Sequence, residues 1–422
     1  MRKLGLSIVA IALLNAQPAQ DPADVLAQVR DKLMPRLPSA PRYTCIATIN
    51  RSYYSRKNPP LTRRSCEQIL EDKKRGRTKL QLDKTDRWRL DLTLTQGHEI
   101  YSWAGPGAFS RSVEEFEQSG PAGTGVLGPH LHEIFSEPAV QFRVLGQNDK
   151  NIEYGFRVPI EASSYLIWAG SRWRETGYDG SFVIDPGSLE LRRLTLGTGE
   201  LPPETSACEE SKILDYPSGG TGVFLPNRAE SHFVMRDTTE TESLTTLSDC
   251  RESTEKVAER PPELIPPLPA DVPFKLELTT SIDTSTAAAG DVVTARLPEA
   301  MNRPPKFQEE LMPKGAILTG RIMRMEHHLD RQGLIAPDGK HVRLQGRRYF
   351  LIWVDFDRVE VKGVVSSFSP RFDCDPAANF CLWALVDGQK SKGAFLFPTE
   401  ADNFVVPAGY VSTWFTNGPL SK

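Results

Sequence analysis

The sequence predicts a mainly β protein with a few helices, built as two domains. Apolar and polar residues alternate along several short segments, which is the pattern of strands with one buried face. The chain contains 33 prolines and 31 glycines, enough to end many short strands in turns. Its 422 residues are too many for one small core, so we expect two domains.

The N-terminus has the layout of a secretory signal peptide. A positive Arg-Lys pair precedes an almost unbroken apolar run, Leu4–Leu14. This run is about half the roughly 20 residues that cross a bilayer. We expect cleavage after Ala16, which removes residues 1–16, with Ala19 as the alternative site. The mature chain is then periplasmic or secreted, without a membrane span. An uncleaved anchor or a buried first helix is the competing interpretation.

The first domain, about residues 21–257, is expected to begin with a helix. Asp21 can cap it, and Pro22 suits its first turn. Pro35 ends it. After it, apolar residues at every second position of 43–49 predict a strand with one buried face.

Further strands follow in the same domain. Trp88, Leu90 and Leu92 are separated by charged residues, which predicts a half-buried antiparallel strand. Similar patterns predict strands at Gly180–Asp185, Leu189–Leu196 and Ser231–Met235. The first two are joined by a predicted hairpin turn, Asp185–Ser188. A short helix is predicted at His130–Phe135.

A family resemblance covers roughly residues 21–255. A helix, an antiparallel meander, a helix-bearing insertion and a Gly-x-x-x-Ile-Asp-Pro strand end at Gly180–Pro186 follow one another. This layout resembles the LolA/LolB-type lipoprotein-carrier superfamily, whose relatives include periplasmic sigma-factor regulators of the MucB/RseB kind. The resemblance implies a curved antiparallel sheet, an unclosed barrel with plug helices on its concave face, where the family binds acyl chains.

The proline-rich stretch 258–273 is predicted to be a semi-rigid linker. Its six prolines favour an extended conformation. A proline-rich loop packed along one domain is the alternative. The second domain, residues 274–422, is expected to be a small β-barrel-like unit whose strands are Phe274–Ser281, Asp291–Leu297, Ala316–Met325 and Phe350–Val361. Because Leu351 and Trp353 make both faces of the last strand apolar, we expect it to be central or covered.

Three short motifs of the second domain carry another resemblance. They are Gly-Asp-x-Val at 290–293, Pro-Lys-Gly-Ala-x-Leu-x-Gly-Arg at 313–321, and Pro-Ala-Gly-Tyr at 407–410. Their order is similar to the C-terminal β-barrel of type IV secretion scaffolds of the TrbI kind. The resemblance implies an assembly module and not an enzyme.

The six cysteines are expected to form disulfides in an exported chain. We predict pairs between neighbours along the sequence: Cys45–Cys66, Cys208–Cys250 and Cys374–Cys381. Free buried thiols are the alternative. No cysteine spacing resembles a zinc site, so we predict no metal.

The aromatic residues of the first domain are candidates for an acyl-binding groove. An open sheet needs a cover on its apolar face, and either a ligand chain or a plug helix supplies it. The expected groove residues are Trp88, Leu90, Leu92, Tyr101, Trp103, Phe109, Trp168 and Trp173. A packed core against the plug helix is the alternative.

A basic stretch, residues 51–89, contains thirteen Lys or Arg against five Asp or Glu. On a disulfide-tied hairpin these side chains would form a positive rim for the phosphate or acid groups of envelope lipids, since arginine binds phosphate in a forked geometry. The candidate rim residues are Arg51, Arg56, Arg63, Arg64, Lys73, Lys74 and Arg75. An ordinary solubilising hairpin is the alternative.

No catalytic motif stands out in the mature sequence. Gly123–Gly128 matches GxGxxG but lacks the surrounding strand–helix–strand pattern, so we expect a loop. Asp355 and Asp357 share a strand face that we expect to be solvated. The pairs His130/His132 and His327/His328 lack metal-binding helical spacing, and we expect surface or hydrogen-bonded histidines. We predict no cofactor.

The net charge of −3 argues against nucleic acid as the main partner. We expect a non-catalytic envelope protein that binds a lipid, a lipoprotein or another acylated ligand in the concave face of the first domain. A structural or assembly module that docks envelope proteins, without a small-molecule ligand, is the alternative. A hydrolase with unrecognised residues is a third interpretation.

Overall fold

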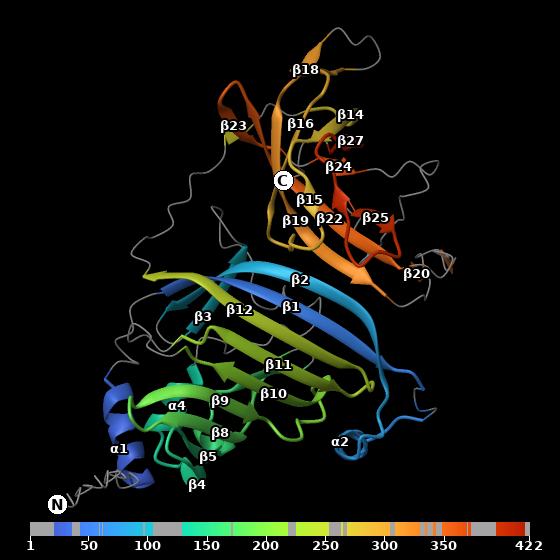
Figure 1. Cartoon of the computed structure of the whole chain (residues 1–422). Coiled ribbons are helices and arrows are strands. Elements are labelled where there is room, and N and C mark those ends of the chain that lie inside the picture. Colours follow the sequence, from blue (N-terminus) through green and yellow to red (C-terminus); the bar gives the residue numbers. More distant parts are fainter. Residues whose placement is uncertain are drawn as a thin grey trace, which may run out of the picture.

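The computed structural model confirms a mainly β chain. It describes residues 21–35, 43–58, 60, 62–95, 98–103, 129–169, 172–217, 225–252, 263–264, 268–303, 309–329, 334–335, 341–342, 348–368, 370–372 and 394–417. Within these residues there are three α-helices, and nineteen strands join into one large sheet (Figure 1). None of the helices in this part of the chain is long and apolar enough to cross a membrane.

The first helix, α1 (Pro22–Leu33), starts where the sequence predicts. The Asp21 side chain accepts a hydrogen bond from the Ala23 backbone N–H at 2.9 Å and so caps the helix. Val25, Val29 and Leu33 are fully buried on one face. The predicted helix near residue 130 is also confirmed as α4 (Pro129–Ser136).

The N-terminal region, residues 21–252, is built on an antiparallel sheet. In spatial order its strands are β4 (Gln141–Gln147), β5 (Ile152–Val158), β8 (Tyr178–Asp185), β9 (Glu190–Gly197), β10 (Ala207–Asp215), β11 (Arg228–Met235), β12 (Glu240–Glu252), β1 (Tyr43–Arg56), β2 (Leu80–Thr95) and β3 (His98–Trp103). Among the described residues β4 and β3 do not pair with each other, so the sheet stays open. Figure 1 shows its curvature. A short β6–β7 pair (Leu166–Ala169, Arg172–Glu175) and the 3-10 turn η1 (Ile160–Ala162) lie between β5 and β8 in sequence.

One face of this sheet, the inner face, carries a continuous apolar core. Alternate residues of β1 from Tyr43 to Arg51 are buried. Trp88, Leu90 and Leu92 continue the same pattern on β2. These side chains form one cluster with residues of α1 and α4. The predicted alternation of both strands is therefore confirmed.

The predicted disulfide pairs of this region are wrong. The structure joins Cys45 to Cys250 and Cys66 to Cys208. Cys45 meets Cys250 because β1 lies beside β12, the last strand of the region. The partners are 205 and 142 residues apart, so neighbours in sequence are not neighbours in the fold. The predicted pair Cys374–Cys381 lies outside the described residues.

The basic stretch is not a simple hairpin. Its strands β1 and β2 pair with each other, but in sequence the helix α2 (Cys66–Lys74) separates them. Ser65 and Gln68 form a reciprocal capping box at the start of α2. Cys66 and Ile69 are buried with Cys208 and Val234, so the disulfide fastens α2 to the sheet.

The C-terminal region, residues 263–417, has its own apolar core. Its larger strands are β14 (Ala270–Leu278), β16 (Val292–Arg296), β19 (Ile317–His328), β22 (Tyr349–Val361), β23 (Val364–Ser367), β25 (Ala394–Pro398) and β27 (Val411–Asn417). The shorter ones are β13 (Glu263–Leu264), β15 (Ile282–Asp283), β17 (Met301–Asn302), β18 (Glu310–Met312), β20 (Leu334–Ile335), β21 (His341–Val342), β24 (Arg371–Phe372) and β26 (Val405–Val406). The central position predicted for the strand at 350–361 is confirmed, because β22 pairs with β19, β23 and β25.

Parts of the predicted linker belong to this sheet. Strand β14 begins at Ala270, and Val272 is buried, its N–H donating to the Thr416 hydroxyl at 3.0 Å. The β14–β27 register shifts between Ala270 and Pro273, where a missing proline N–H is tolerated. The short strand β13 pairs in parallel with β23. Residues 253–262 and 265–267 lie outside the described residues.

The two regions meet in a hydrogen-bonded seam along β2, which we call the β2 seam. Strand β19 pairs with β2 at Asp86, Thr85 and Lys84. Next to it, the Arg89 N–H donates to Ala289 O at 2.7 Å, and the Ala289 N–H donates to Arg87 O at 2.8 Å. From Leu90 to Thr95, the same edge of β2 pairs with β3. The C-terminal region therefore extends the N-terminal sheet.

Candidate ligand-binding site

The expected groove residues of β2 and β3 lie together on the inner face. Leu90 pairs with Trp103, and Leu92 pairs with Tyr101, across the β2–β3 ladder. Trp88, Leu90, Leu92 and Tyr101 are buried, and Trp103 is half-buried against the same cluster. Trp168 and Trp173 are cross-strand partners in the β6–β7 ladder, with side chains outside the described part of the chain. Phe109 also lies outside it.

Two helices pack against this apolar face. They contribute Val25, Val29 and Leu33 from α1 and Leu131, Ile134 and Phe135 from α4. The Phe135 ring meets the Phe182 ring of β8 edge-on, with centroids 5.1 Å apart. The two helices thus cover part of the inner face on which we expect an acyl chain. This is the place expected for the plug helices.

A few polar contacts around one carboxylate hold α4 in this position. The Glu133 carboxylate accepts hydrogen bonds from the Tyr178 hydroxyl at 3.0 Å and from the Ser164 hydroxyl at 3.2 Å. The Ser164 N–H donates to it as well. Burial raises the pKa of Glu133, although these hydrogen bonds oppose the effect. A separate contact links α1 to α4: the Arg30 guanidinium donates to Phe135 O at 3.0 and 3.1 Å.

His130 of α4 is buried in the same place, contrary to the expected surface or hydrogen-bonded histidine. Its ring lies 4.9 Å from the Tyr165 ring and 5.4 Å from the Tyr178 ring. Its Nε2 atom has no hydrogen-bond partner in the described structure. Burial, and next the charge of Lys212, lower the pKa of His130 to about 3. The imidazole is therefore neutral at physiological pH.

A buried polar row crosses the inner face next to the apolar residues. Arg51 pairs in register with Asp86 on one side and with Ser243 on the other. Ser243 pairs with Ser231, and Ser231 pairs with Lys212. All five side chains are buried. We call these five residues, which lie on five neighbouring strands, the inner polar row. On β1 and β2 the row lies two residues away from Ile49 and Trp88.

The charges of the inner polar row are paired. The Arg51 Nε and NH2 atoms donate to the two Asp86 carboxylate oxygens at 2.8 and 2.6 Å. The guanidinium also lies 3.7 Å from the centre of the Trp88 ring. Burial alone would lower the pKa of Arg51, but the Asp86 carboxylate together with Tyr53 and Glu326 outweighs it and raises the pKa above its usual value. Lys212 pairs with Glu210 at 3.1 Å.

Arg51 is therefore wrongly assigned to the basic rim. The signal for its position is present in the sequence, because Arg51 continues the alternate positions of Cys45, Ala47 and Ile49. A basic residue in that phase of a strand points to the buried face. Lys212 continues the buried phase of Cys208 and Leu214 in the same way.

The other basic residues lie near α2, most of them in ion pairs. Arg56 and Arg64 both pair with Asp72, and Arg75 pairs with Glu71 at 2.6 Å. Lys73 Nζ lies 2.9 Å from His232 Nδ1 and 3.9 Å from the Glu240 carboxylate. Arg63 and Lys74 are exposed. Much of the positive charge of this stretch is thus neutralised within the fold.

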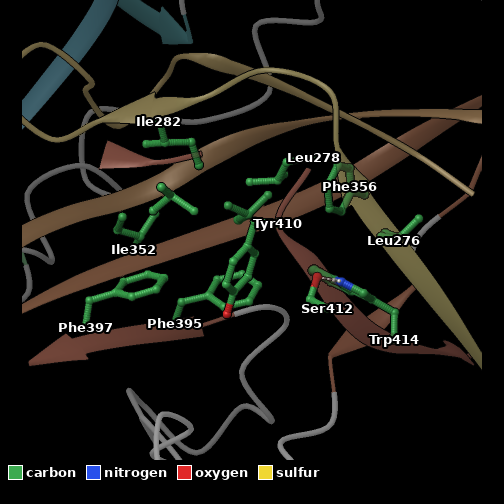
Figure 2. Close-up of a pocket in the computed structure, with 12 residues that line it drawn as sticks. Leu276, Leu278, Ile282, Ile352, Phe356, Phe395, Phe397, Tyr410, Ser412 and Trp414 are labelled. Atoms are coloured by element: carbon green, nitrogen blue, oxygen red, sulfur yellow. Dashed lines mark hydrogen bonds between the residues drawn. The ribbon is translucent and has the colours of Figure 1, made fainter. Parts of the chain in front are cut away.

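A second apolar hollow lies in the C-terminal region. It is a small pocket of about 20 Å³, room for about one water molecule. Figure 2 shows its side chains, which come from β14, β15, β22, β25, β26 and β27 and from Tyr410 between strands: Leu276, Leu278, Ile282, Ile352, Val354, Phe356, Phe395, Phe397, Val406, Tyr410, Ser412 and Trp414. We call it the C-terminal pocket.

The remaining candidate motifs of the sequence are the acidic and histidine pairs and the glycine-rich stretch. No group of three His, Cys, Asp or Glu side chains in the described residues is placed to hold a metal ion. Asp357 is exposed and Asp355 is half-buried on β22. The glycine motif at 123–128 lies outside the described residues.

Comparisons with known proteins add little to this geometry. No family model and no curated protein matches the chain. A similar solved structure is the LolA superfamily protein NE2245 from Nitrosomonas europaea, which is 9% identical; the alignment covers 56% of this chain and 94% of that one, with a TM-score of 0.22. The TrbI-type resemblance stays a prediction.

Proposed function

We propose that this protein is an exported, non-catalytic binding protein that receives a lipidic or acylated ligand on the concave inner face of its N-terminal sheet. The observation that supports this most directly is the cover on that face. Helix α4 has only eight residues and buries three apolar side chains, and its polar contacts are those of Glu133 and the hydrogen bonds from Arg30 to Phe135 O. A hydrocarbon chain offers the same apolar surface that α4 supplies.

The energetics of exchange between helix and ligand are favourable in principle. Each methylene group that leaves water contributes about 0.8 kcal/mol. A chain that takes the place of Leu131, Ile134 and Phe135 would compensate for the apolar surface that α4 leaves uncovered. The inner polar row sets one end of this site, because Arg51 and Lys212 lie beyond the apolar residues. The polar end of the ligand would lie on that side.

Export is supported by the two disulfides of the N-terminal region. Cys45–Cys250 and Cys66–Cys208 close long loops, and such bonds persist in oxidising compartments. The predicted signal peptide at residues 1–16 indicates the same location, periplasmic or secreted.

One observation favours the alternative function, an assembly module for envelope proteins. Strand β4 forms an edge of the sheet, since it pairs only with β5 in the described structure. Val144 is 50% exposed and Leu145 is 48% exposed on this edge. An extended segment of a partner protein can add to such an edge by backbone hydrogen bonds.

Mass spectrometry of bound lipid distinguishes the two functions. The mature full chain is purified without detergent, denatured in organic solvent and tested for extracted acyl lipids. We expect up to one acylated molecule per chain, with a higher occupied fraction in Glu133→Ala, which removes the hydrogen bonds that the Glu133 carboxylate makes from α4. Glu137→Ala, just past the end of the same helix, is the matched control and is expected to match the wild type. A protein free of lipid that retains envelope proteins instead would contradict the proposal and support assembly.

A further inference from the structure

The end of β1, the helix α2 and the start of β2 form a basic tip, which we define as residues 56–79. The tip contains nine Lys or Arg against three Asp or Glu, although the whole chain has a net charge of −3. Figure 1 shows α2 at the end of the N-terminal sheet away from α1. The Cys66–Cys208 disulfide fastens the tip to β10. A concentrated positive charge is thus held at one end of the sheet.

The acidic side chains of the tip balance only part of this charge. Asp72 and Glu71 already pair with arginines of the tip. Glu67 is the third acid, and it is exposed. Five exposed cations of the tip have no ion-pair partner among the residues that the structure describes: Lys57, Arg63, Lys74, Arg77 and Lys79.

Two of these cations lie directly opposite each other. Arg56 pairs with Leu80 at the end of the β1–β2 ladder. Just beyond this pair, the Lys57 N–H donates to Lys79 O at 3.1 Å. Like charges at opposite positions of adjacent strands are destabilising, and Arg77 adds a third charge two residues before Lys79. The stability of the fold gives no reason for this arrangement, whereas an external anion would compensate it.

We propose that the basic tip docks the protein on a membrane surface rich in anionic lipid headgroups. The five cations are spread over the end of β1, the approach to α2, α2 itself and the segment before β2, which suits an array of phosphate groups better than one small anion. Guanidinium groups bind phosphate oxygens in a forked geometry. This docking surface is separate from the ligand site proposed on the concave inner face.

The docking is electrostatic and does not insert side chains into the membrane. Within the described part of residues 56–79, none of the large apolar side chains is strongly exposed. Ile69 is buried against Cys208 and Val234, and Leu70 packs beside it. Segments that insert into a membrane interface need an exposed apolar face. Because salt screens exposed charges beyond about 8 Å at 0.15 M and about 3 Å at 1 M, binding should weaken steeply with salt.

Co-sedimentation with lipid vesicles tests the docking. The mature full chain is mixed with vesicles of pure phosphatidylcholine, or with vesicles of phosphatidylcholine and phosphatidylglycerol in equal parts. We expect the chain to bind the mixed vesicles in about 0.1 M salt and to be released in about 1 M salt. Binding to the neutral vesicles should be at least about tenfold weaker.

Charge-removing variants locate the docking surface. The triple change Lys74→Gln, Arg77→Gln and Lys79→Gln should weaken binding to the mixed vesicles about hundredfold, because each Lys or Arg near an anionic bilayer contributes about fivefold. The matched control removes three exposed cations elsewhere, with the same change in net charge: Lys150→Gln, Arg157→Gln and Lys314→Gln. It should weaken binding less than about threefold.

A single change in the opposite direction completes the test. Glu67→Gln removes the exposed acid of the tip and should strengthen binding to the mixed vesicles by up to about fivefold. A misfolded variant would not produce such a gain. The result therefore reports on the charge of the tip and not on the stability of the chain.

Three results would overturn the proposal. They are equal binding to neutral and mixed vesicles, binding that persists in about 1 M salt, and equal losses in the two triple variants. Heparin, a soluble acidic polysaccharide, is tested in parallel; binding to heparin without binding to vesicles would also exclude a membrane partner. None of these results bears on the lipid retained by the concave face, because that lipid is measured by extraction and through Glu133→Ala.

Discussion

Gly290 lies directly against the backbone of Arg89. A Cβ atom placed on Gly290 would be 2.1 Å from the Arg89 carbonyl oxygen, and the glycine has a φ of +106°. The two residues come from different regions of the chain and meet in the β2 seam. Gly290 also donates its N–H to Ile322 O at 2.7 Å. The close approach of the regions therefore requires a residue without a side chain here.

Gly290→Ala is expected to loosen the β2 seam. A methyl group cannot fit beside Arg89 O, so the backbones must separate, at a cost of about 3 kcal/mol or more in unfolding free energy. Gly315→Ala is the matched control: its φ of +85° is similar, but no atom lies within 4 Å of its Cβ position. It should cost only about 1 kcal/mol. Urea unfolding of both variants measures the difference. Equal losses would show that the seam does not need the close contact.

The Arg51–Asp86 pair is expected to be sensitive to the loss of one partner. Asp86→Ala leaves a buried guanidinium without its counter-charge and should cost about 3–5 kcal/mol. The double change Arg51→Met with Asp86→Leu removes both charges and should cost much less. Glu71→Ala, at the exposed pair with Arg75, is the control and should cost less than about 1 kcal/mol. Thermal and urea unfolding report these values; a loss below 1 kcal/mol in Asp86→Ala would contradict the account of the inner polar row.

Peptide mapping without reduction should find Cys45 joined to Cys250 and Cys66 joined to Cys208. Because each bond closes a loop of more than 100 residues, the paired change Cys66→Ser with Cys208→Ser should cost about 2–5 kcal/mol. The loss should be absent when wild type and variant are compared under reducing conditions. A Cys45–Cys66 peptide would show that α2 docks differently.

His130 is expected to make stability depend on acid pH. Its pKa is about 3 in the folded chain, below its usual value of about 6.5. As the pH falls below 6.5, the unfolded chain binds a proton that the folded chain does not, so stability falls. Between pH 7 and 4.5 the wild type should lose about 2–3 kcal/mol more than His130→Phe.

The control for this prediction is on the same helix. His132 is exposed, so His132→Phe should keep the pH dependence of the wild type. Urea midpoints at the two pH values provide the comparison. A parallel response of His130→Phe and the wild type would mean that the buried imidazole takes up its proton in the folded state.

Local patterns account for the parts of the fold that the sequence predicts. Asp21 caps α1 through its own side chain, and the Asp185 carboxylate accepts from the N–H groups of Gly187 and Ser188 in the predicted turn. The alternation along β1 and β2 follows from one buried face. Each of these features depends on residues within a few positions of one another.

Non-local pairing accounts for what the sequence could not predict. Cys45 and Cys250 meet only because the first and last strands of the N-terminal sheet are neighbours. Glu326 lies beside Asp86 only because β19 adds to the edge of β2. The C-terminal pocket likewise gathers side chains from six strands. No short motif marks any of these contacts.

The β2 seam also supplies partners for the buried Glu326 carboxylate, a contact that no sequence motif indicates. Glu326 lies 2.9 Å from His328 Nε2 and 3.4 Å from Lys84 Nζ, which come from both sides of the β2 seam. Burial alone would raise the pKa of Glu326, but the hydrogen bond and charge of His328 together with the charges of Lys84 and Arg324 outweigh it and hold the pKa well below its usual value. The carboxylate is thus charged at neutral pH and ties the regions together.

Hydrogen exchange of α4 tests the proposed function most directly. The mature chain, freed of lipid, is measured with and without a saturating acyl ligand. If the ligand takes the place of α4, amide exchange in residues 129–136 should accelerate on binding, while exchange in β2 around Leu90 and Leu92 slows. Unchanged or slower exchange in α4 when the ligand is bound would contradict a concave site beneath this helix.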